Sequence, residues 1–339
     1  MFTTGPTFFA ASGPPGQIVP GSVGAAGFNG EDLLVFRISS TEFALRYSSS
    51  GFRIRKGTVS GNTVTFGSPA STDARCLIEG TYAAGVDISG STQLTVSTVD
   101  LATMSVVSTF TLVTGGAPNV PQLCALDSTT LLVLWTNSGT SYARVLNSAA
   151  GVLSAAGPDQ TLASIVGQPL RAASSSNAVL ASTGRAYNIS GGTVTLGGTV
   201  YAPPNSTIIV ADMLGGLGAH FYETGGVLKA FRAATSGTVT TYSSVEDQTS
   251  AASFNGMVVS RAWDGGIIRV ARKSSDGFKL FAQLHGFAGT INSLGPEVQV
   301  TTTLANYNTV VGLSNTTAVA LWAAASPFPV SYSVLSFTG

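Results

Sequence analysis

The chain has 339 residues, of which 44% are hydrophobic and only 9% are charged, with 16 basic and 16 acidic side chains. This composition excludes a disordered chain, which would lack apolar residues and carry excess charge. The balanced charge also excludes a general nucleic-acid-binding protein, because neutralising phosphates requires clustered Lys and Arg.

The beginning of the chain, MFTTGPTFFAASGPPG, does not have the features of a secretory signal. It carries no positively charged region, and glycine and proline interrupt it before an adequate apolar stretch can form. No apolar run elsewhere reaches the roughly 18 residues of a membrane-spanning helix, so we expect no membrane insertion. We therefore expect synthesis in the cytoplasm without a signal peptide.

From residue 32 onward the sequence is a succession of short strands. Alternating apolar and polar runs of about five to nine residues are separated by Gly, Ser, Asn or Asp, which is the pattern of strands joined by tight turns. These runs group into four-strand units at about 32–73, 74–119, 120–166, 167–206, 207–255 and 256–305. A spacing of roughly 35–50 residues per unit is typical of the blades of a β-propeller.

The last unit, 306–339, supplies only three strands. The N-terminal segment 1–31 contains two short apolar runs, TFFAAS and QIVPG, and either could pair with the last unit as its fourth strand. This pairing would close a ring and remove two exposed strand edges. The sequence thus predicts a single all-β domain over residues 1–339, a seven-bladed β-propeller of four-stranded antiparallel blades with ring closure between N-terminal and C-terminal strands.

A Gly-Thr-Val-Thr motif recurs near the ends of three units, as GNTVTFG at 61–67, GGTVTLG at 191–197 and SGTVTTY at 236–242. We interpret its glycines as the tight turn into the outermost strand of a blade, since glycine adopts positive φ without steric cost. Thr193 and Thr195 are then expected on one face of that strand and Val194 on the other.

Four further residues occupy matching places in different units. Trp135 and Trp322 fall in second strands, and Cys76 and Cys124 fall in the first strands of successive units. We expect both tryptophans in the core between blades. We expect both cysteines as buried thiols, because free Cys behaves as a small core hydrophobe, and a disulfide between adjacent blades is the alternative.

A compact cluster of basic residues occurs in FRIRKG, which contains Arg53, Arg55 and Lys56. In a strand, alternation places Arg53 and Arg55 on the same face. We expect a solvated strand edge here rather than a nucleic-acid site.

No constellation of residues indicates catalysis, a cofactor or a metal. His220 and His285 lie in different units without Cys or carboxylates at ligand spacing, so we expect no metal site. P-loop, dinucleotide-binding and nucleophile-elbow motifs are missing, and we expect no cofactor. The acids are thinly spread and mostly at turns, and the Asp-box of sialidase-like propellers is absent, the nearest stretch being SSDGF at 274–278. We predict a protein that is not an enzyme.

The candidate binding residues are Trp263 and Asp264 in the WDGG turn between a first and a second strand. A tryptophan at a turn can stack on a sugar ring while the neighbouring carboxylate accepts a hydrogen bond from a hydroxyl. The alternative is that Trp263 simply covers the edge of its own blade. WDGG occurs once, whereas a multivalent lectin propeller would repeat its aromatic and polar set in every blade.

Units that end in SG-x-TVT-x-G, in a chain with low charge and strong β character, resemble the β-propeller repeats of virion proteins of tailed bacteriophages and related particles. The residues that carry the resemblance are Ser60–Gly67, Ser190–Gly197 and Ser236–Thr240, with looser copies at Gly151–Gly157 and Gly289–Gly295. The resemblance in architecture extends over most of the chain, and the residues that carry it form a short turn-and-strand motif. It implies a fibre, spike or decoration protein of a particle, often concerned with host-surface binding, and it carries over no catalytic residue.

We therefore predict a non-enzymatic structural and adhesive component of a phage-like particle, made in the host cytoplasm and located in the virion. Its expected partners are other virion proteins, contacted through the Gly- and Pro-rich N-terminal segment at 11–27, and host-surface carbohydrate. The sequence leaves open whether the chain forms a homo-oligomer. The alternatives are a free-standing carbohydrate-binding propeller and a propeller glycoside hydrolase, which would need two acids across a cleft.

Overall fold

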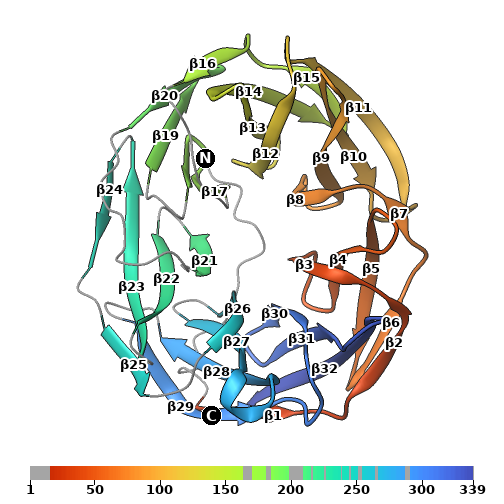
Figure 1. Cartoon of the computed structure of the whole chain (residues 1–339), viewed down its shortest axis with the longest axis vertical. Coiled ribbons are helices and arrows are strands. Elements are labelled where there is room, and N and C mark those ends of the chain that lie inside the picture. Colours follow the sequence, from red (N-terminus) through yellow and green to blue (C-terminus); the bar gives the residue numbers. More distant parts are fainter. Residues whose placement is uncertain are drawn as a thin grey trace.

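The computed structural model describes residues 16–162, 170–180, 185–197, 209–214, 217–224, 227–237, 239–243, 246–250, 254–263, 266–286 and 291–338. Over these residues the chain forms seven antiparallel sheets arranged as a ring around a central axis (Figure 1). The helical content of this part of the chain is the single turn η1 (Ser274–Asp276). Among the described residues, no helix has the length and apolar character needed to span a membrane. The prediction of a seven-bladed, all-β propeller is confirmed.

The strands of each blade follow one another in sequence from the axis outward. Blade 1 is β3 (Glu31–Arg37), β4 (Glu42–Ser48), β5 (Phe52–Ser60) and β6 (Thr63–Phe66), with the short β7 (Ala70–Ser71) also paired to β5. Blade 2 is β8 (Ala74–Ile78), β9 (Tyr82–Gly90), β10 (Gln93–Asp100) and β11 (Ser105–Val113). Blade 3 is β12 (Pro118–Ala125), β13 (Thr130–Asn137), β14 (Thr140–Ala149) and β15 (Val152–Ala155), with β16 (Gln160–Leu162) paired to β14.

The remaining blades repeat this plan. Blade 4 is β17 (Leu170–Ser174), β18 (Asn177–Leu180), β19 (Arg185–Ser190) and β20 (Thr193–Leu196). Blade 5 is β21 (Ile209–Leu214), β22 (Leu217–Thr224), β23 (Val227–Ser236) and β24 (Val239–Tyr242), with β25 (Glu246–Ser250) paired to β23. Blade 6 is β26 (Phe254–Trp263), β27 (Gly266–Lys273), β28 (Lys279–Gly286) and β29 (Asn292–Gln299). Blade 7 is β30 (Tyr307–Ser314), β31 (Thr317–Ala323) and β32 (Pro329–Thr338), completed by β1 (Gln17–Pro20) and β2 (Gly24–Asn29).

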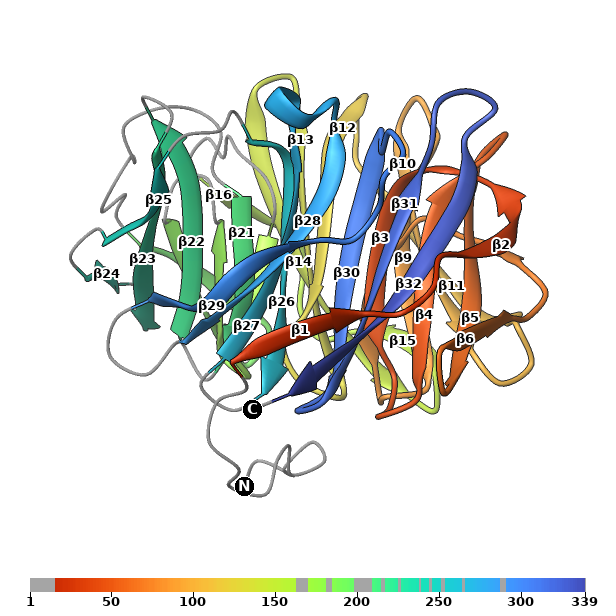
Figure 2. The same ribbon diagram turned by 90° about the horizontal axis from the view of Figure 1, so that it is seen from below.

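The ring closes through strands from the two ends of the chain. β1 pairs antiparallel with β32, from Gln17 opposite Thr338 to Pro20 opposite Leu335, and the two strands lie side by side in Figure 2. Ile18 of β1 is only 3% exposed, because it packs in an apolar cluster formed by blades 6 and 7. The predicted closure is therefore made by QIVPG. The other predicted closing run, TFFAAS, lies outside the described residues.

The apolar core lies between neighbouring blades. Each of the six apolar clusters among the described residues joins the facing sides of two adjacent blades. Second strands are the most apolar elements, since blades cover both of their faces. Trp135 in β13 and Trp322 in β31 are 2% and 1% exposed, as predicted from the sequence.

The recurring glycine motif forms the turn into the outermost strand in blades 1, 4 and 5. Gly61, Gly191 and Gly237 have φ values of 56°, 54° and 58°, in the left-handed region that favours glycine. The strands that follow them, β6, β20 and β24, are the outermost strands of their blades. The motif is thus a structural turn, as the sequence indicated.

The alignment of the third copy is corrected by one residue. Ser60 pairs with Thr63 and Ser190 with Thr193, whereas Ser236 pairs with Val239, so in the third copy valine takes the place that threonine has in the other two. As a result Val239 is 53% exposed, and Thr240 is fully buried. In a two-residue hairpin the turn fixes which residues of the two strands pair. The strand register therefore follows the position of the turn and not the similarity of the three sequences.

The basic cluster of FRIRKG does not form a solvated edge. Arg53, Arg55 and Lys56 lie in β5, the third strand of blade 1, and all three are partly buried. The Arg55 guanidinium stacks over the Phe28 ring at 4.5 Å, and its Nε donates a hydrogen bond to the Tyr47 hydroxyl at 2.9 Å. The charge at this position therefore packs on aromatic rings within the protein.

Candidate functional site in the axial channel

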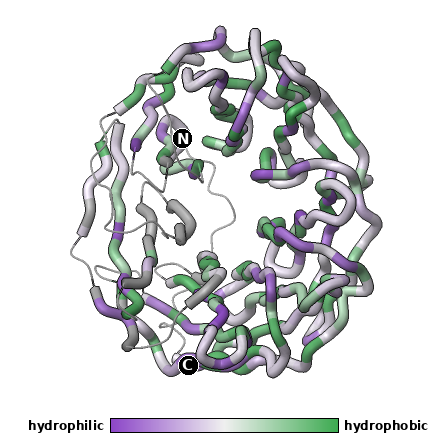
Figure 3. The backbone as a smooth tube through the Cα atoms, viewed as in Figure 1, coloured by the Kyte–Doolittle hydropathy of each residue, from purple (hydrophilic) through white to green (hydrophobic). Residues whose placement is uncertain are grey.

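The first strands of the blades surround a cavity on the propeller axis, which we call the axial channel. Its volume is about 460 Å³, within the roughly 300–1,000 Å³ typical of small-molecule sites. Residues of β3, β8, β12, β17, β26 and β30 line it, so six blades contribute among the described residues. Figure 3 shows hydrophilic stretches on inner strands around the central opening, beside predominantly apolar segments of the blades.

Three arginines line the axial channel, and none of its described lining residues is acidic. Arg37 lies at the end of β3, Arg75 in β8 and Arg171 in β17. Two of the three are held by backbone carbonyls: Arg37 Nε donates to the oxygen of Ser39 at 3.1 Å, and Arg171 Nη1 donates to that of Leu170 at 3.1 Å. These side chains bring cationic groups from blades 1, 2 and 4 to one cavity.

Arg75 is anchored by a carboxylate behind the channel wall. Its Nη2 contacts Asp73 Oδ2 at 2.5 Å, while Asp73 Oδ1 accepts a hydrogen bond from Arg46 Nε at 2.8 Å. Asp73 and Arg46 are both buried. The Nε of Arg75 is buried and has no hydrogen-bond partner. A buried polar group without a partner is costly to the folded state.

The two cysteines line the same channel as free thiols. Cys124 is buried, as predicted, whereas Cys76 is partly exposed. Burial raises the pKa of the Cys76 thiol to about 12 and raises the pKa of Cys124 as well, and the nearby Arg171 guanidinium lowers both pKa values by a smaller effect. Both side chains are thus neutral thiols at physiological pH.

Of the two predicted glycan-contact residues, the structure describes the backbone of Trp263. Trp263 is the last residue of β26 and pairs with Gly266 at the hairpin into β27, which confirms the predicted turn between a first and a second strand. Ser260, three residues earlier in β26, lines the channel, so the Trp263 backbone is about 10 Å further along the strand. Asp264 lies outside the described residues.

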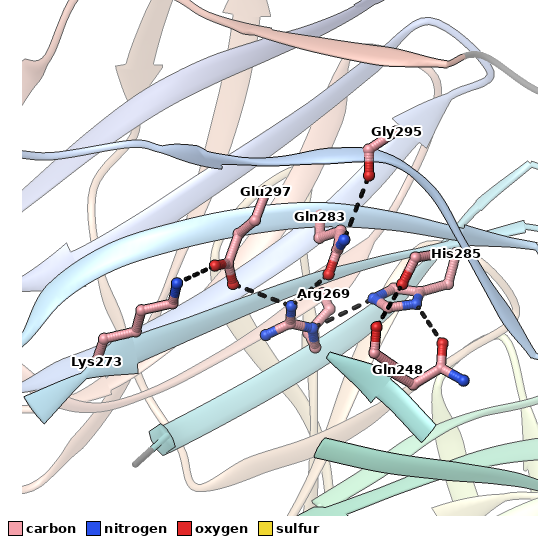
Figure 4. Close-up of polar contacts among 8 residues, drawn as sticks. Gln248, Arg269, Lys273, Gln283, His285, Gly295 and Glu297 are labelled. Carbon is pink, nitrogen blue, oxygen red and sulfur yellow. Dashed lines mark hydrogen bonds and ion pairs between the residues drawn. The ribbon is translucent and has the colours of Figure 1, made fainter. Parts of the chain in front are cut away.

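His285, the second histidine considered from the sequence, belongs to a buried polar network (Figure 4). Arg269 Nε donates to His285 Nε2 at 3.2 Å, so the ring proton is on Nδ1, which lies 3.2 Å from the acceptor Gln248 Oε1. Arg269 Nη2 also donates to Gln283 Oε1 at 2.7 Å and to Glu297 Oε1 at 3.0 Å. The network therefore links β27, β28 and β29 of blade 6 to β25 of blade 5.

Because the His285 imidazole is buried, it is unsuitable as a general base. The side chain is fully buried, and burial together with the Arg269 charge lowers its pKa well below the usual value. Lys273 and Arg269 both form ion pairs with Glu297, so this carboxylate is neutralised at the end of the network. His220 lies in β22, where its backbone pairs with Val210 and Phe231. Among the described residues, no three His, Cys, Asp or Glu lie close enough together to hold a metal.

No protein family matches this sequence, and no curated protein matches it. Several solved structures match most of the chain. A fungal alcohol oxidase of the AA5 family, in complex with copper, is 13% identical with a TM-score of 0.63, covering 94% of this chain and 76% of its own. A putative 6-phosphogluconolactonase from Bacteroides fragilis is 13% identical with a TM-score of 0.56, and the match covers 84% of this chain and 86% of that protein. A protein of unknown function from Dyadobacter fermentans is 12% identical with a TM-score of 0.50, and the match covers 95% of this chain and 100% of that protein.

At these identities the likeness demonstrates the propeller fold and nothing about chemistry. The sequence motifs did not indicate the arginines of the channel, because these residues lie in different units and belong to no motif. A signal for them was nevertheless present. Arg37, Arg75 and Arg171 each interrupt or end a short first strand, and first strands surround the axis once the propeller is assigned.

Proposed function

We propose that the protein is a non-enzymatic β-propeller component of a phage-like particle, attached through its N-terminal segment and adhesive toward host-surface glycans. The observation that carries the proposal is the position of β1. This strand pairs with β32 at the outer edge of blade 7, and Gly16, at its N-terminal side, lies with its backbone against Gly295 of β29. Residues 1–15 are therefore joined to the outer edge of a ring that β1 has already closed.

The distribution of charge supports a non-enzymatic role. A glycosidase needs two carboxyl groups roughly 5 to 9.5 Å apart across the scissile bond, yet the described lining of the axial channel contains no acid. Six of the described acids form ion pairs with Lys or Arg instead: Asp32, Glu42, Asp73, Asp159, Asp247 and Glu297. These pairs neutralise the carboxylates within and between the strands of the blades.

The attachment test compares the full chain with a chain beginning at Gln17, and with a third form in which residues 1–16 are replaced by a Gly/Ser linker of equal length. Each is produced during particle assembly, and purified particles are probed for the protein. We expect the full chain in particles, and both altered forms free in solution with an unchanged melting temperature. Absence of the full chain from particles, or normal incorporation of either altered form, would overturn the proposal.

The adhesive part of the proposal rests on the WDGG turn at the end of β26. A glycan array with the purified protein should show binding that Trp263→Ala abolishes, because the indole supplies the stacking surface. Phe278→Ala is the matched control, since Phe278 is a surface aromatic that is 37% exposed. Glycan binding by a chain that never associates with particles would favour the alternative, a free-standing carbohydrate-binding propeller.

A further inference from the structure

The outer edge of blade 2 differs from the outer edges of the other blades. Its strand, β11, lies at the periphery of the ring and has nine residues (Figure 1). The outermost strands of blades 1, 3, 4 and 5, which are β6, β15, β20 and β24, have four residues each. In blade 6, β29 carries Pro296 and Glu297 and contacts β1, and β1 also covers the edge of β32 in blade 7. Propellers keep their edges short or protected, because an open edge strand is a template for another strand, and β11 departs from this rule.

The composition of β11 does nothing to prevent pairing. None of its residues is charged and none is proline, although these are the residues with which natural edge strands exclude a second chain. Val106, Val107 and Val113 are instead 54%, 38% and 67% exposed. The ladder to β10 skips Val107, so the regular part of the strand is residues 108–113, which we call the open edge.

The hydrogen-bond pattern shows which backbone groups of the open edge point away from β10. Directly after β11, the Thr114 amide donates to the Thr92 carbonyl at 2.8 Å. Bonded pairs recur at every second residue of an antiparallel ladder, so the amides and carbonyls of Thr109, Thr111 and Val113 point outward. Within the part of the chain that the structure describes, the backbone groups of these three residues have no partner, and their side chains are exposed.

We propose that the open edge pairs antiparallel with the open edge of a second copy of this chain, about a two-fold axis beside Thr111. In this register Thr111 lies opposite Thr111 of the second copy, and Thr109 lies opposite Val113. All three residues have outward-pointing backbone groups, so each pair exchanges two hydrogen bonds and the joined sheet gains about six.

The side chains of the open edge suit a second copy of the same strand. Cross-strand threonine pairs are favourable, which fits Thr111 opposite itself. On the other face of the strand Phe110 lies opposite Leu112 of the second copy, an aromatic beside an aliphatic side chain. The Arg144 guanidinium, 5.9 Å from the Phe110 ring, is paired with Asp159 at 2.7 Å. The two-fold axis therefore places no charged residue of β11 opposite another, and the neighbouring cation is already neutralised.

Analytical ultracentrifugation of the intact protein tests the proposal. An interface of one short strand from each chain belongs to the small, reversible class, so we expect a monomer–dimer equilibrium between about 1 and 500 µM. A protein that stays monomeric throughout this range would overturn the proposal and leave the open edge to a strand of a different protein. Assembly beyond the dimer would also overturn it, because two-fold pairing consumes the edge.

Thr111→Pro removes the central donor of the pairing and leaves the blade intact. The Thr111 amide points away from β10, and proline is tolerated on an edge strand at such a position. We expect an unchanged melting temperature and a dimer dissociation constant raised by about tenfold or more. Thr111→Val is the matched control, since it keeps the amide and a β-branched side chain and should dimerise like the wild type. Dimerisation of the proline variant at wild-type strength would overturn the proposal.

Cross-linking tests the register on a strand whose backbone is unaltered. In the Thr111→Cys variant the two thiols occupy a bonded pair with Cα atoms about 5.5 Å apart, within the range that a disulfide spans. Thr109→Cys is the matched control, because position 109 is equally exposed but lies about 14 Å from its copy along the strand. Oxidised glutathione should link the Thr111→Cys variant into dimers, and leave the Thr109→Cys variant and the wild type unlinked.

Equal cross-linking of the two cysteine variants, or none in the Thr111→Cys variant, would overturn the proposal. This measurement also covers a proline variant that fails to fold. None of the readouts depends on particle attachment or on glycan binding, so the dimer and the proposed function can fail separately.

Discussion

Thr240 occupies, in blade 5, the outer-strand position that valine occupies in blades 1 and 4. Across the hairpin, Val59 pairs with Val64 and Ile189 with Val194, whereas Thr235 pairs with Thr240. The two threonine hydroxyls are buried and lie 3.1 Å apart, so one donates a hydrogen bond to the other. Two polar residues thus replace an apolar pair without leaving an unsatisfied group.

A double-mutant cycle tests this pairing. Thr240→Val should lower the free energy of unfolding by about 1–3 kcal/mol, because it leaves the Thr235 hydroxyl buried without its partner. Adding Thr235→Val recreates the apolar pair of blade 1, and the double variant should return to within about 0.5 kcal/mol of the wild type. Urea unfolding measures both values. Additive losses in the double variant would show that the hydroxyls do not interact.

At the scale of elements, the Arg269 network joins strands whose apolar packing alone would not determine their relative position. Its members come from β25, β27, β28 and β29, and the His285 ring also contacts Phe221 of blade 5 edge-on at 5.1 Å. Buried charges are tolerated only when paired and hydrogen-bonded. The interface between blades 5 and 6 is therefore held by specific hydrogen bonds as well as by the packing of its side chains.

The network makes stability depend on pH. Because the pKa of His285 is lowered in the folded state, the unfolded chain binds one proton more below about pH 6.5, and the free energy of unfolding falls as the pH falls. Between pH 7.5 and 5.5, before most carboxylates titrate, we expect a loss of about 1 kcal/mol from this residue. His285→Gln should remove that loss, although it is less stable at pH 7.5. An equally steep decline in the variant would contradict this assignment. Urea unfolding at both pH values provides the measurement.

At the scale of the whole molecule, closure by β1 converts seven blades into one unit. Ile18 packs against blades 6 and 7, and beyond β1 the Gly21 amide donates to the Val334 carbonyl at 2.8 Å. Without β1, the edge of β32 would present unpaired backbone groups, which favour pairing with another chain.

Truncation separates closure from attachment. A chain beginning at Ser22 lacks β1 and should lose about 3 kcal/mol or more of unfolding free energy, from the burial of Ile18 and the lost ladder. The chain beginning at Gln17 keeps β1 and should unfold like the full chain. Thermal unfolding gives the comparison, and size-exclusion chromatography should show the shorter form associating. Equal stability of the two truncated chains would mean that β1 does not hold the ring closed.

The parts of this protein that could be predicted from its sequence are those governed by local chemistry. Alternation of apolar residues, glycine at turns and the unit length predicted strands, blades and ring closure by one of two N-terminal runs, TFFAAS or QIVPG, and the structure shows that QIVPG closes the ring. The burial of Trp135 and Trp322 followed from their place in apolar second strands. The register of the third glycine motif could not be predicted, because its letters match the other two copies one residue out of step with the pairing of Ser236 and Val239.

Only the tertiary structure decided which distant residues meet. Arg37, Arg75 and Arg171 come from separate blades and share a cavity because the ring brings first strands to one axis. Arg269 and His285 meet because they occupy neighbouring strands of blade 6 and the adjoining blade buries them. The alternation of apolar and polar residues shows which face of a strand is apolar. The curvature of the ring determines which residues of other blades that face contacts. For this reason the sequence by itself determined the architecture, and the tertiary structure decided the chemistry of the axis.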